Sequence, residues 1–458
     1  MNPTTRGQRR HTELVNTKNL GKYRAMAQVT PNISTGLGAI VSVLMGGALL
    51  RHGNLENYRI YFYIAAALYG LGTFGVVVGY NPPPRELQVT LTTAQKFRSL
   101  DWMGIFLSTT GLTLFVLALS WYSNPYRFSS AAVLAPFVIG IVLLIAFANY
   151  EWLIKKDGIL HHGFFHHRNF PISCIIIFAE GVAFFTLNSY FVFEQTVVMG
   201  SDSCDASLRL LIFYCGSIVV TTGAGLYTTW TKRLSDPLVL GFSIYTAFAG
   251  AMTTVNATTS PATTCGFATL ASVANGLVLL NVIIAAQLAT PREMIAVTTS
   301  LLIAIRGFGG AVGTVVNNAI ISNTLKTNLG PNMAAAVLPL GFPAEELGLL
   351  IAALTSNDQE ALTHIPGITP TIIGAAVGAI QSSYALAFRH CWFVSTSFLA
   401  LAFGVSCFVS NPKEEFNAHI DAPAEAKLAK LQHEIDMADA ESTARAVEKL
   451  AVEHPAPH

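Results

Sequence analysis

The sequence is short of charge. Only 12% of its 458 residues are Asp, Glu, Lys or Arg, whereas 52% are hydrophobic, and the mean hydropathy is +0.50. A soluble domain carries about twice that share of charged residues, so the composition excludes an ordinary soluble protein and indicates several membrane-spanning helices. Because the net charge is only +1 and no basic face accumulates, we expect no nucleic-acid partner.

Several familiar signatures are missing as well. The six cysteines lie mostly in apolar runs without CxxC spacing, so we expect free thiols. The first 24 residues are polar and basic, with no apolar run before a cleavage site, and do not resemble a signal peptide. No nucleophile elbow, phosphate-binding loop or dinucleotide fingerprint occurs in a suitable context.

One histidine-rich stretch, HHGFFHHR, suggests a metal. Its four histidines are His161, His162, His166 and His167, and their spacing is similar to one histidine box of membrane di-iron enzymes. Such enzymes need several boxes, and the other eight histidines never pair up again. We therefore expect no enzymatic activity, no metal and no cofactor.

Ten runs are long and apolar enough to cross a bilayer, whose hydrocarbon core of about 30 Å takes about 20 helical residues. They cover approximately residues 31–50, 60–80, 102–121, 131–150, 170–194, 206–227, 237–255, 262–287, 295–323 and 388–410. The sequence therefore predicts an all-α membrane protein. Between the last two spans we expect a long outer loop, 324–370, with a short helix at PAEELGLLIAAL. Residues 371–390 look amphipathic and are predicted to lie at the membrane interface.

The Lys and Arg residues predict the orientation, because they are retained on the cytoplasmic side. With the N-terminus inside, 20 of the 27 fall in inner segments and six in outer segments or helix ends. Both termini are therefore expected in the cytoplasm. The sequon at Asn256 then faces outward, where a glycan can be attached.

Two charges lie deep within predicted spans. Arg306 is in the apolar run that begins near Ile295, and Glu180 lies ten residues beyond Phe170, about 15 Å into its helix. Ionisable residues at such depth usually face a bundle interior or a cavity and are paired. We predict that Glu180 carries a coupling proton and that Arg306 binds substrate, the alternative for Arg306 being a structural or snorkelling role. Glu194 at the end of the same span is interpreted as an interface residue.

Glycines and isolated polar residues give weaker signals. Small residues allow helices to approach closely, and the candidates for packing or gating are Gly38, Gly46, Gly47, Gly309, Gly310 and Gly313. Tight packing without a gating role explains them equally well. Polar residues in apolar runs line a cavity or join helices, and those predicted to contact substrate with Arg306 are Asn188, Tyr190, Asn275 and Gln287.

Several motifs occur in the order of a known family. ELVNTKNLGKYR followed by GLGAIVSVLMGGALL resembles the loop and fifth helix of fungal fourteen-helix major facilitator transporters. The stretches beginning SLDWMGIF, DGILHHGFF and IRGFGGAVG resemble the seventh, ninth and thirteenth helices of the trichothecene efflux pump and siderophore transporter group. The resemblance covers about residues 11 to 412. It implies a major facilitator fold and an incomplete set of helices, because the first four and their cytoplasmic motif are absent.

The resemblance also implies a division of the chain. We expect a cytoplasmic segment 1–30, two N-terminal bundle helices 31–80, a linker with two extra helices 81–169, a six-helix C-terminal bundle 170–410 and a cytoplasmic tail 411–458. The antiporter motif of the fifth helix has Ser42 and Val43 where the family carries Gly-Pro. The missing helices indicate a truncated gene, a misassigned start or an incomplete carrier.

The implied function is proton-coupled transport of an amphipathic organic molecule, a toxin or a ferric siderophore, across the plasma or vacuolar membrane. Its partners would be membrane lipid, protons and a small molecule. The alternative is a membrane remnant whose C-terminal bundle folds but carries nothing. Rocking of one bundle against the other is the family's implied mechanism, and import is not distinguished from export.

Overall fold

The computed structural model describes residues 24–50, 57–79, 93–121, 129–155, 158, 162–290, 294–356, 362 and 364–411. The predictions for residues 1–23, for most of the 81–101 connection and for the tail from 412 lie outside the described residues. Contacts divide the chain into two compact units. The larger consists of residues 23–64 and 101–416, and the smaller of residues 1–22, 65–100 and 417–458.

The described part of the smaller unit contains the second half of α3 (Tyr58–Gly79) and the short helix α5 (Thr93–Ser99). No residue of α3 is buried, although its sequence is strongly apolar. Leu71, Phe74 and Val77 are among its exposed large side chains. Such a surface is stable against lipid rather than water, which fits a membrane span.

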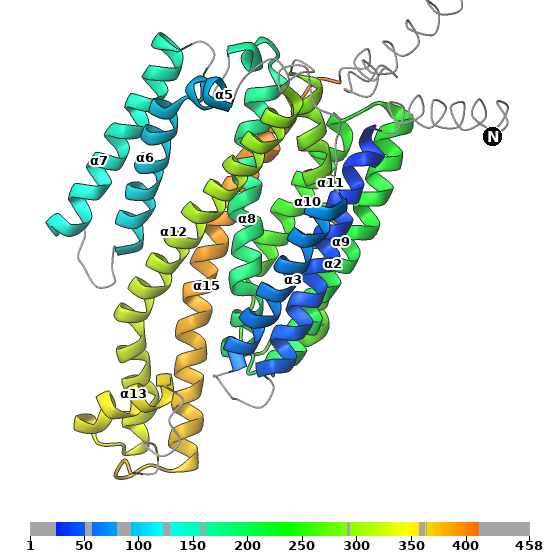
Figure 1. Cartoon of the computed structure of the whole chain (residues 1–458). Helices are drawn as coiled ribbons and strands as arrows, with labels where there is room; N and C mark the ends of the chain where they lie inside the picture. The colour runs from blue at the N-terminus through cyan, green and yellow to red at the C-terminus, as the bar shows by residue number, and fades with distance from the viewer. Residues whose placement is uncertain are drawn as a thin grey trace, which may run out of the picture. The chain divides into compact units, whose positions relative to one another are not determined.

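The larger unit is also built from helices (Figure 1). They are α2 (Arg24–Leu50), α6 (Trp102–Trp121), α7 (Ala131–Asn149), α8 (Asn169–Val198), α9 (Ser203–Thr231), α10 (Ser235–Met252), α11 (Pro261–Leu288), α12 (Ile295–Val337), α13 (Leu347–Ser356) and α15 (Pro370–Ser406). The short turns are the π-helical η2 (Tyr150–Ile154) and the 3₁₀ turns η3 (His162–His166), η5 (Leu338–Leu340) and η6 (Ala344–Glu346).

Local sequence signals set several helix starts. The Ser260 side chain accepts from the Thr263 N–H, and Pro261 occupies the first turn of α11. Thr369 and Pro370 repeat this arrangement at α15, where the Thr369 hydroxyl accepts from the Ile372 N–H. A capping side chain satisfies an otherwise orphaned donor, and proline lacks the donor that would be orphaned.

Helix α8 lies at the centre of the bundle formed by α8 to α12 and α15 (Figure 1). It contacts α9, α11, α12 and α15. Large buried rings fill the space around it, among them Phe191, Phe213, Phe242, Phe388 and Trp392. Each such ring removes a large apolar area from its surroundings, so the position of α8 is strongly fixed.

The remaining long helices of the larger unit pack against this bundle in two places. Helix α2 lies on α9, where a Cβ at Gly47 would lie 3.0 Å from the Ser207 Oγ. Helices α6 and α7 form a pair, and α6 also contacts α12. The two helices approach closely at Gly140, where a Cβ would lie only 2.7 Å from the Phe115 backbone nitrogen.

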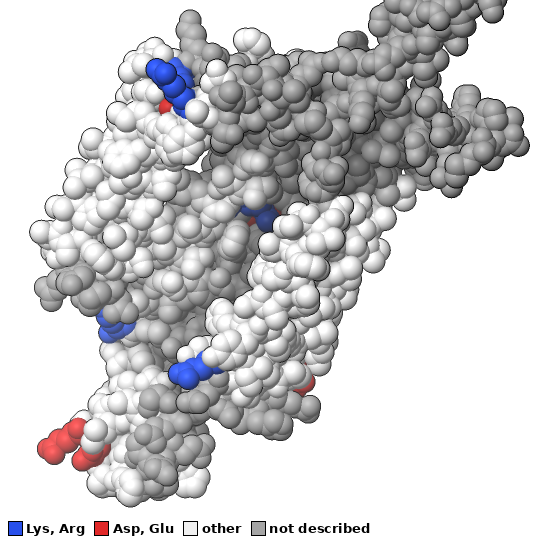
Figure 2. Space-filling model, in the orientation of Figure 1, with Lys and Arg blue, Asp and Glu red and all other residues white. Residues whose placement is uncertain are grey.

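The membrane character of the fold is confirmed. Among the described residues, nine helices are long and apolar enough to cross a membrane. The tenth predicted span is present as the 18-residue helix α10 but is not among those nine. On the face in Figure 2 most of the described surface carries no charged side chain.

The region between the last two spans differs from the prediction. Residues 324–337, expected at the start of an outer loop, continue α12, and residues 371–390 are part of α15 rather than a separate interfacial segment. The short helix predicted at PAEELGLLIAAL is confirmed as η6 and α13. A second small core explains the extension, because it buries Met333, Val337, Phe342, Leu350 and Ile372. These apolar contacts stabilise helix that hydropathy alone assigns to a loop.

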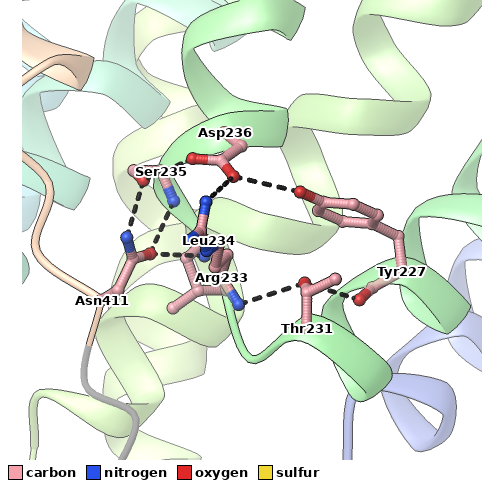
Figure 3. A network of polar contacts seen from close by, with 7 residues as sticks. All are labelled: Tyr227, Thr231, Arg233, Leu234, Ser235, Asp236 and Asn411. Atoms are coloured by element: carbon pink, nitrogen blue, oxygen red, sulfur yellow. Dashed lines mark hydrogen bonds and ion pairs between the residues drawn. The ribbon is translucent and has the colours of Figure 1, made fainter.

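Asparagine side chains fix the segment after α15 to the bundle, and one of them lies at the turn between α9 and α10 (Figure 3). Asn411 Oδ1 accepts from the backbone N–H groups of Leu234 and Ser235 at 2.7 and 3.0 Å, and its Nδ2 donates to the Ser235 hydroxyl at 2.8 Å. Similarly, the Asn169 side chain at the start of α8 donates to the Ser410 carbonyl at 2.9 Å and accepts from the Ser410 N–H at 2.9 Å. The hydrogen bonds of Asn411 and Asn169 both fix the segment after α15.

Candidate functional site

An ion pair lies buried in the bundle. Arg306 on α12 donates from Nε to Glu180 Oε2 at 2.6 Å and from Nη2 to Oε1 at 2.9 Å. The Glu180 side chain is 0% exposed and that of Arg306 is 14% exposed. The fork of two parallel bonds is the strongest geometry for a guanidinium and a carboxylate. The two deep charges predicted from the sequence are therefore partners of each other.

Glycines bring the two helices together at this point. A Cβ at Gly181 would lie 2.2 Å from the Arg306 carbonyl oxygen, and one at Gly309 would lie 2.3 Å from the Phe178 carbonyl oxygen. One at Gly310 would meet the Phe185 ring at 2.2 Å, and one at Gly313 would lie 3.0 Å from Val182. Only hydrogen fits at the closest positions. The spacing from Gly309 to Gly313 thus places α12 directly against α8.

The other predicted packing glycines differ among themselves. A Cβ at Gly38 or Gly46 on α2 would have no described atom within 4 Å, whereas a Cβ at Gly47 would contact Ser207 on α9. Where the space around a glycine is open, an alanine would fit equally well, so the glycine is not needed for close helix packing. The described contacts thus give Gly47, and not Gly38 or Gly46, a packing role.

Aromatic and amide groups surround the ion pair. The guanidinium carbon of Arg306 lies 4.0 Å from the centre of the Phe184 ring, a cation–π contact. One turn further along α8, Asn188 accepts a hydrogen bond from the Tyr214 hydroxyl on α9 and donates to the Phe184 carbonyl. Tyr245 on α10 is buried within electrostatic range of both charges, and its hydroxyl has no partner among the described residues.

Further polar contacts join α8 to α12. The Tyr190 hydroxyl bonds to Asn318 Oδ1 at 2.8 Å and to the Thr314 carbonyl at 3.2 Å. Asn317 is 0% exposed and donates to Thr186 Oγ1 at 2.8 Å, but its Oδ1 lacks a partner among the described residues. These side chains form a second group of polar contacts between α8 and α12, beyond the ion pair in the direction of the α8 C-terminus.

Two of the predicted substrate residues belong to other contacts. Asn275 on α11 donates to Ser217 on α9 at 3.4 Å, and its Oδ1 has no partner in the described part of the chain. Gln287, near the end of α11, donates to Thr299 on α12 at 2.8 Å. Among the described residues, Asn188 therefore lies close to the ion pair and Tyr190 lies further along α8, whereas no contact joins Asn275 or Gln287 to the pair.

Glu194 differs from its interpretation as an interface residue that ends the helix. Helix α8 continues to Val198, and Glu194 is 1% exposed. Its Oε2 accepts a hydrogen bond from Trp392 Nε1 on α15 at 2.8 Å. Hydropathy placed Glu194 at a span boundary, whereas packing against α15 buries it.

The aromatic residues of the site could not be identified from the sequence. Phe184, Tyr214, Tyr245 and Trp392 are four of 47 Phe, Trp and Tyr residues in a chain that is 10% aromatic. Nothing local distinguishes them from ring side chains in the core. Only the three-dimensional positions of Glu180, Arg306 and Glu194 identify them.

A hollow of about 560 Å³ lies between α6 and α12. It is lined by Leu112, Thr113, Val116, Leu117, Ser120, Ala304, Gly307, Phe308 and Ala311. This lining has no charged group and only two hydroxyl groups, so it offers no specific contact for a polar substrate. The ion pair, and not this hollow, is the candidate site.

A multi-pass helical bundle that encloses paired charges is the architecture of an integral membrane protein with a polar site inside. The chain belongs to a family of major facilitator proteins. Residues 15–432 match the family described as Fungal trichothecene efflux pump (TRI12), which confirms the predicted resemblance.

Individual relatives agree with this assignment. A protein named Trichothecene efflux pump TRI12 from Fusarium sporotrichioides is 24% identical over 76% of this chain and 59% of its own length. An Acurin A biosynthesis cluster MFS-type transporter from Aspergillus aculeatus is 25% identical over 83% of this chain and 66% of its own length. A second TRI12 pump, from Trichoderma arundinaceum, is 24% identical over 92% of this chain and 70% of its own. The chain thus spans about three fifths to seven tenths of the length of these relatives.

Proposed function

We propose that this protein is a proton-coupled secondary carrier of an amphipathic organic molecule, and not an enzyme, in the plasma or vacuolar membrane. The family supports a carrier, because relatives are named as efflux pumps and transporters. The observation that carries the coupling proposal is the buried fork between Glu180 and Arg306. Charges this deep are expensive to bury and are retained mostly for function.

The pair couples a proton to a substrate by exchange of partners. A proton on Glu180 removes the negative charge that holds Arg306, which frees the guanidinium for an anionic or oxygen-rich substrate group. When the substrate leaves, Arg306 returns to Glu180 and the proton is released, because an unpaired buried charge is unfavourable. Proton and substrate thus favour each other's binding at this pair.

The neighbouring side chains suit such a substrate. Phe184 offers its ring face to the guanidinium, and Asn188 bonds to the Phe184 carbonyl and to the Tyr214 hydroxyl. An amphipathic toxin or a ferric siderophore presents both apolar surface and oxygen atoms to these groups. Tyr190, Asn275 and Gln287 complete the proposed contacts. Asn275 Oδ1 has no partner in the described part of the chain and is available to accept a hydrogen bond.

The test is transport by the full chain in lipid vesicles, with a trichothecene and a ferric siderophore as probes. Glu180→Gln is expected to abolish transport driven by a pH gradient but to spare exchange of probe across the membrane. Arg306→Gln is expected to weaken probe binding in both assays. The matched control is Arg209→Gln, which removes a partly buried arginine on α9 bonded to Gln195 and Ser201.

Wild-type proton coupling in Glu180→Gln would remove this carboxylate from the mechanism. Unchanged probe affinity in Arg306→Gln would reduce the arginine to a structural role. If the wild-type chain moves neither probe, the carrier function falls and the alternative holds, a bundle that folds but carries nothing.

A further inference from the structure

Glu194 is a second buried carboxyl group, and its surroundings differ from those of Glu180. It is 1% exposed, and its hydrogen bond comes from a neutral donor, the Trp392 indole N–H at 2.8 Å. None of the described Lys, Arg or His side chains lies within ion-pair distance of it. Burial of an ionised carboxylate without a cation is far less favourable than burial of the neutral acid.

We propose that Glu194 is a proton-binding site separate from the Glu180–Arg306 pair. The neutral acid is stable in contact with the Trp392 ring system, and one indole donor is enough to hold its carbonyl oxygen. Loss of the proton leaves a charge that a single neutral hydrogen bond compensates only in part. The carboxyl group therefore binds and releases a proton without exchanging a salt-bridge partner.

The groups around Glu194 support this assignment. The elements packed around this part of α8 carry the following titratable or charged side chains: Tyr384, Arg389, His390 and Cys391 on α15, Cys204, Asp205 and Arg209 on α9, Cys265 on α11, Lys326 on α12, and Tyr245 on α10, which packs against α15. Cys391 is in electrostatic range of Glu194. Arg389, His390 and Lys326 are exposed, and Arg209 donates to Gln195 and Ser201. Thus no cation is directed toward the carboxyl group.

Further polar side chains lie on α8 between the two carboxyl groups. Glu194 and Glu180 are 14 positions apart on one helix, which corresponds to about 21 Å. Between them lie Thr186 and Tyr190, which bond to Asn317 and Asn318 on α12. Buried polar atoms without protein partners are where ordered water binds, and Asn317 Oδ1 has no partner among the described residues. Among the described residues no hydrogen bond joins these groups to Glu180 or Glu194, so the two carboxyl groups are separate sites on one helix.

Only the role of this proton in coupling rests on the proposed function. Proton binding itself is measured by infrared difference spectroscopy on the purified full chain in lipid, titrated from about pH 5 to about pH 10, a range that includes a buried, cation-free acid. The neutral acid has a C=O stretch distinct from the carboxylate. We expect one such band to be lost with rising pH in the wild type, absent in Glu194→Gln, and retained in Glu180→Gln.

Trp392→Phe is the second variant, because it keeps an aromatic ring but removes the donor. A hydrogen bond to the charged form favours that form, so its loss is expected to move the same transition to higher pH. A wild-type spectrum in Glu194→Gln, or no band change in the wild type, would overturn the proposal. The spectra do not need transport, so a chain that carries neither probe would remove the proposed function and leave this site standing.

Discussion

Gly309 on α12 faces the backbone carbonyl of Phe178 on α8 so closely that a Cβ at position 309 would lie 2.3 Å from that oxygen. A backbone carbonyl within a helix cannot move aside as the end of a flexible side chain can. The contact therefore sets the separation of the two helices that carry Arg306 and Glu180.

Gly309→Ala is expected to destabilise the bundle by about 1–3 kcal/mol, the range for overpacked sites, and to lower its thermal unfolding midpoint in detergent. Gly307→Ala is the matched control, because it lies two residues away on the same helix with nothing within 4 Å of its Cβ. Equal midpoints for the two variants would contradict close packing at Gly309.

Removal of one partner of the ion pair leaves a buried charge. Arg306→Met alone is expected to reduce the free energy of unfolding by about 3–5 kcal/mol, whereas Arg306→Met combined with Glu180→Gln should recover a large part of that loss. A double-mutant cycle measures the coupling between the two positions. Strictly additive effects would show that the fork contributes nothing to stability.

Asp101, just before α6, makes stability depend on acid pH. Burial raises the pKa of its carboxyl. The Gly104 N–H, the neutral acid form of Glu151, the Tyr150 hydroxyl and the Lys155 ammonium donate to the Asp101 carboxylate and outweigh burial, so the pKa is held below its usual value. A lowered pKa in the folded state adds stability above the unfolded value of about 3.9 and loses it as pH falls through the folded value.

Asp101→Asn should therefore flatten the acid limb of the unfolding midpoint against pH, compared with Asp205→Asn, which removes an exposed carboxylate in the first turn of α9. An unchanged acid limb in Asp101→Asn would assign the effect to other groups.

Asn411 holds the turn between α9 and α10 through three hydrogen bonds. Asn411→Ala is expected to speed hydrogen exchange at the Leu234 and Ser235 amides by about fivefold or more, since one hydrogen bond contributes about 1 kcal/mol. The amide of Thr258, which bonds within the turn before α11, serves as internal control. Unchanged exchange at Leu234 would mean that the Asn411 side chain is not needed to order this turn.

The charge distribution predicts which ends face the cytoplasm. In cysteine-free protein, a cysteine introduced at the exposed His166 should be protected from a membrane-impermeant thiol reagent in intact cells, and one at the exposed Thr258 should react. The same topology places a glycan on Asn256 in secretory expression. Labelling at His166 and not at Thr258 would invert the orientation.

Hydropathy predicted most of the fold, because a run of about 20 apolar residues has few alternatives in a membrane. It failed where helices extend beyond such runs, as in α12 past Asn323 and α15 before Phe388. There the small core around Met333 and Phe342 stabilises helix that carries no hydropathy signal.

The site was predictable in its charges but not in its partners. Depth in an apolar run identified Arg306 and Glu180, because deep charge is rare. Their contact depends on Gly181 and Gly309, whose close approach sequence spacing only suggests. Burial of Glu194 depends on Trp392, which lies 198 positions away along the chain.

Because α12 is long, a small tilt at the ion pair would produce a large displacement at its C-terminal end. From Arg306 to Val337, α12 runs 31 positions, about 46 Å of helix, with Pro331 in the last two turns. A tilt of about 5° with its pivot at the ion pair would displace the far end by about 4 Å over that length. A spectroscopic label near Leu340 therefore magnifies a movement at the buried pair, and a binder fixed to α13 would restrain that movement from a distance.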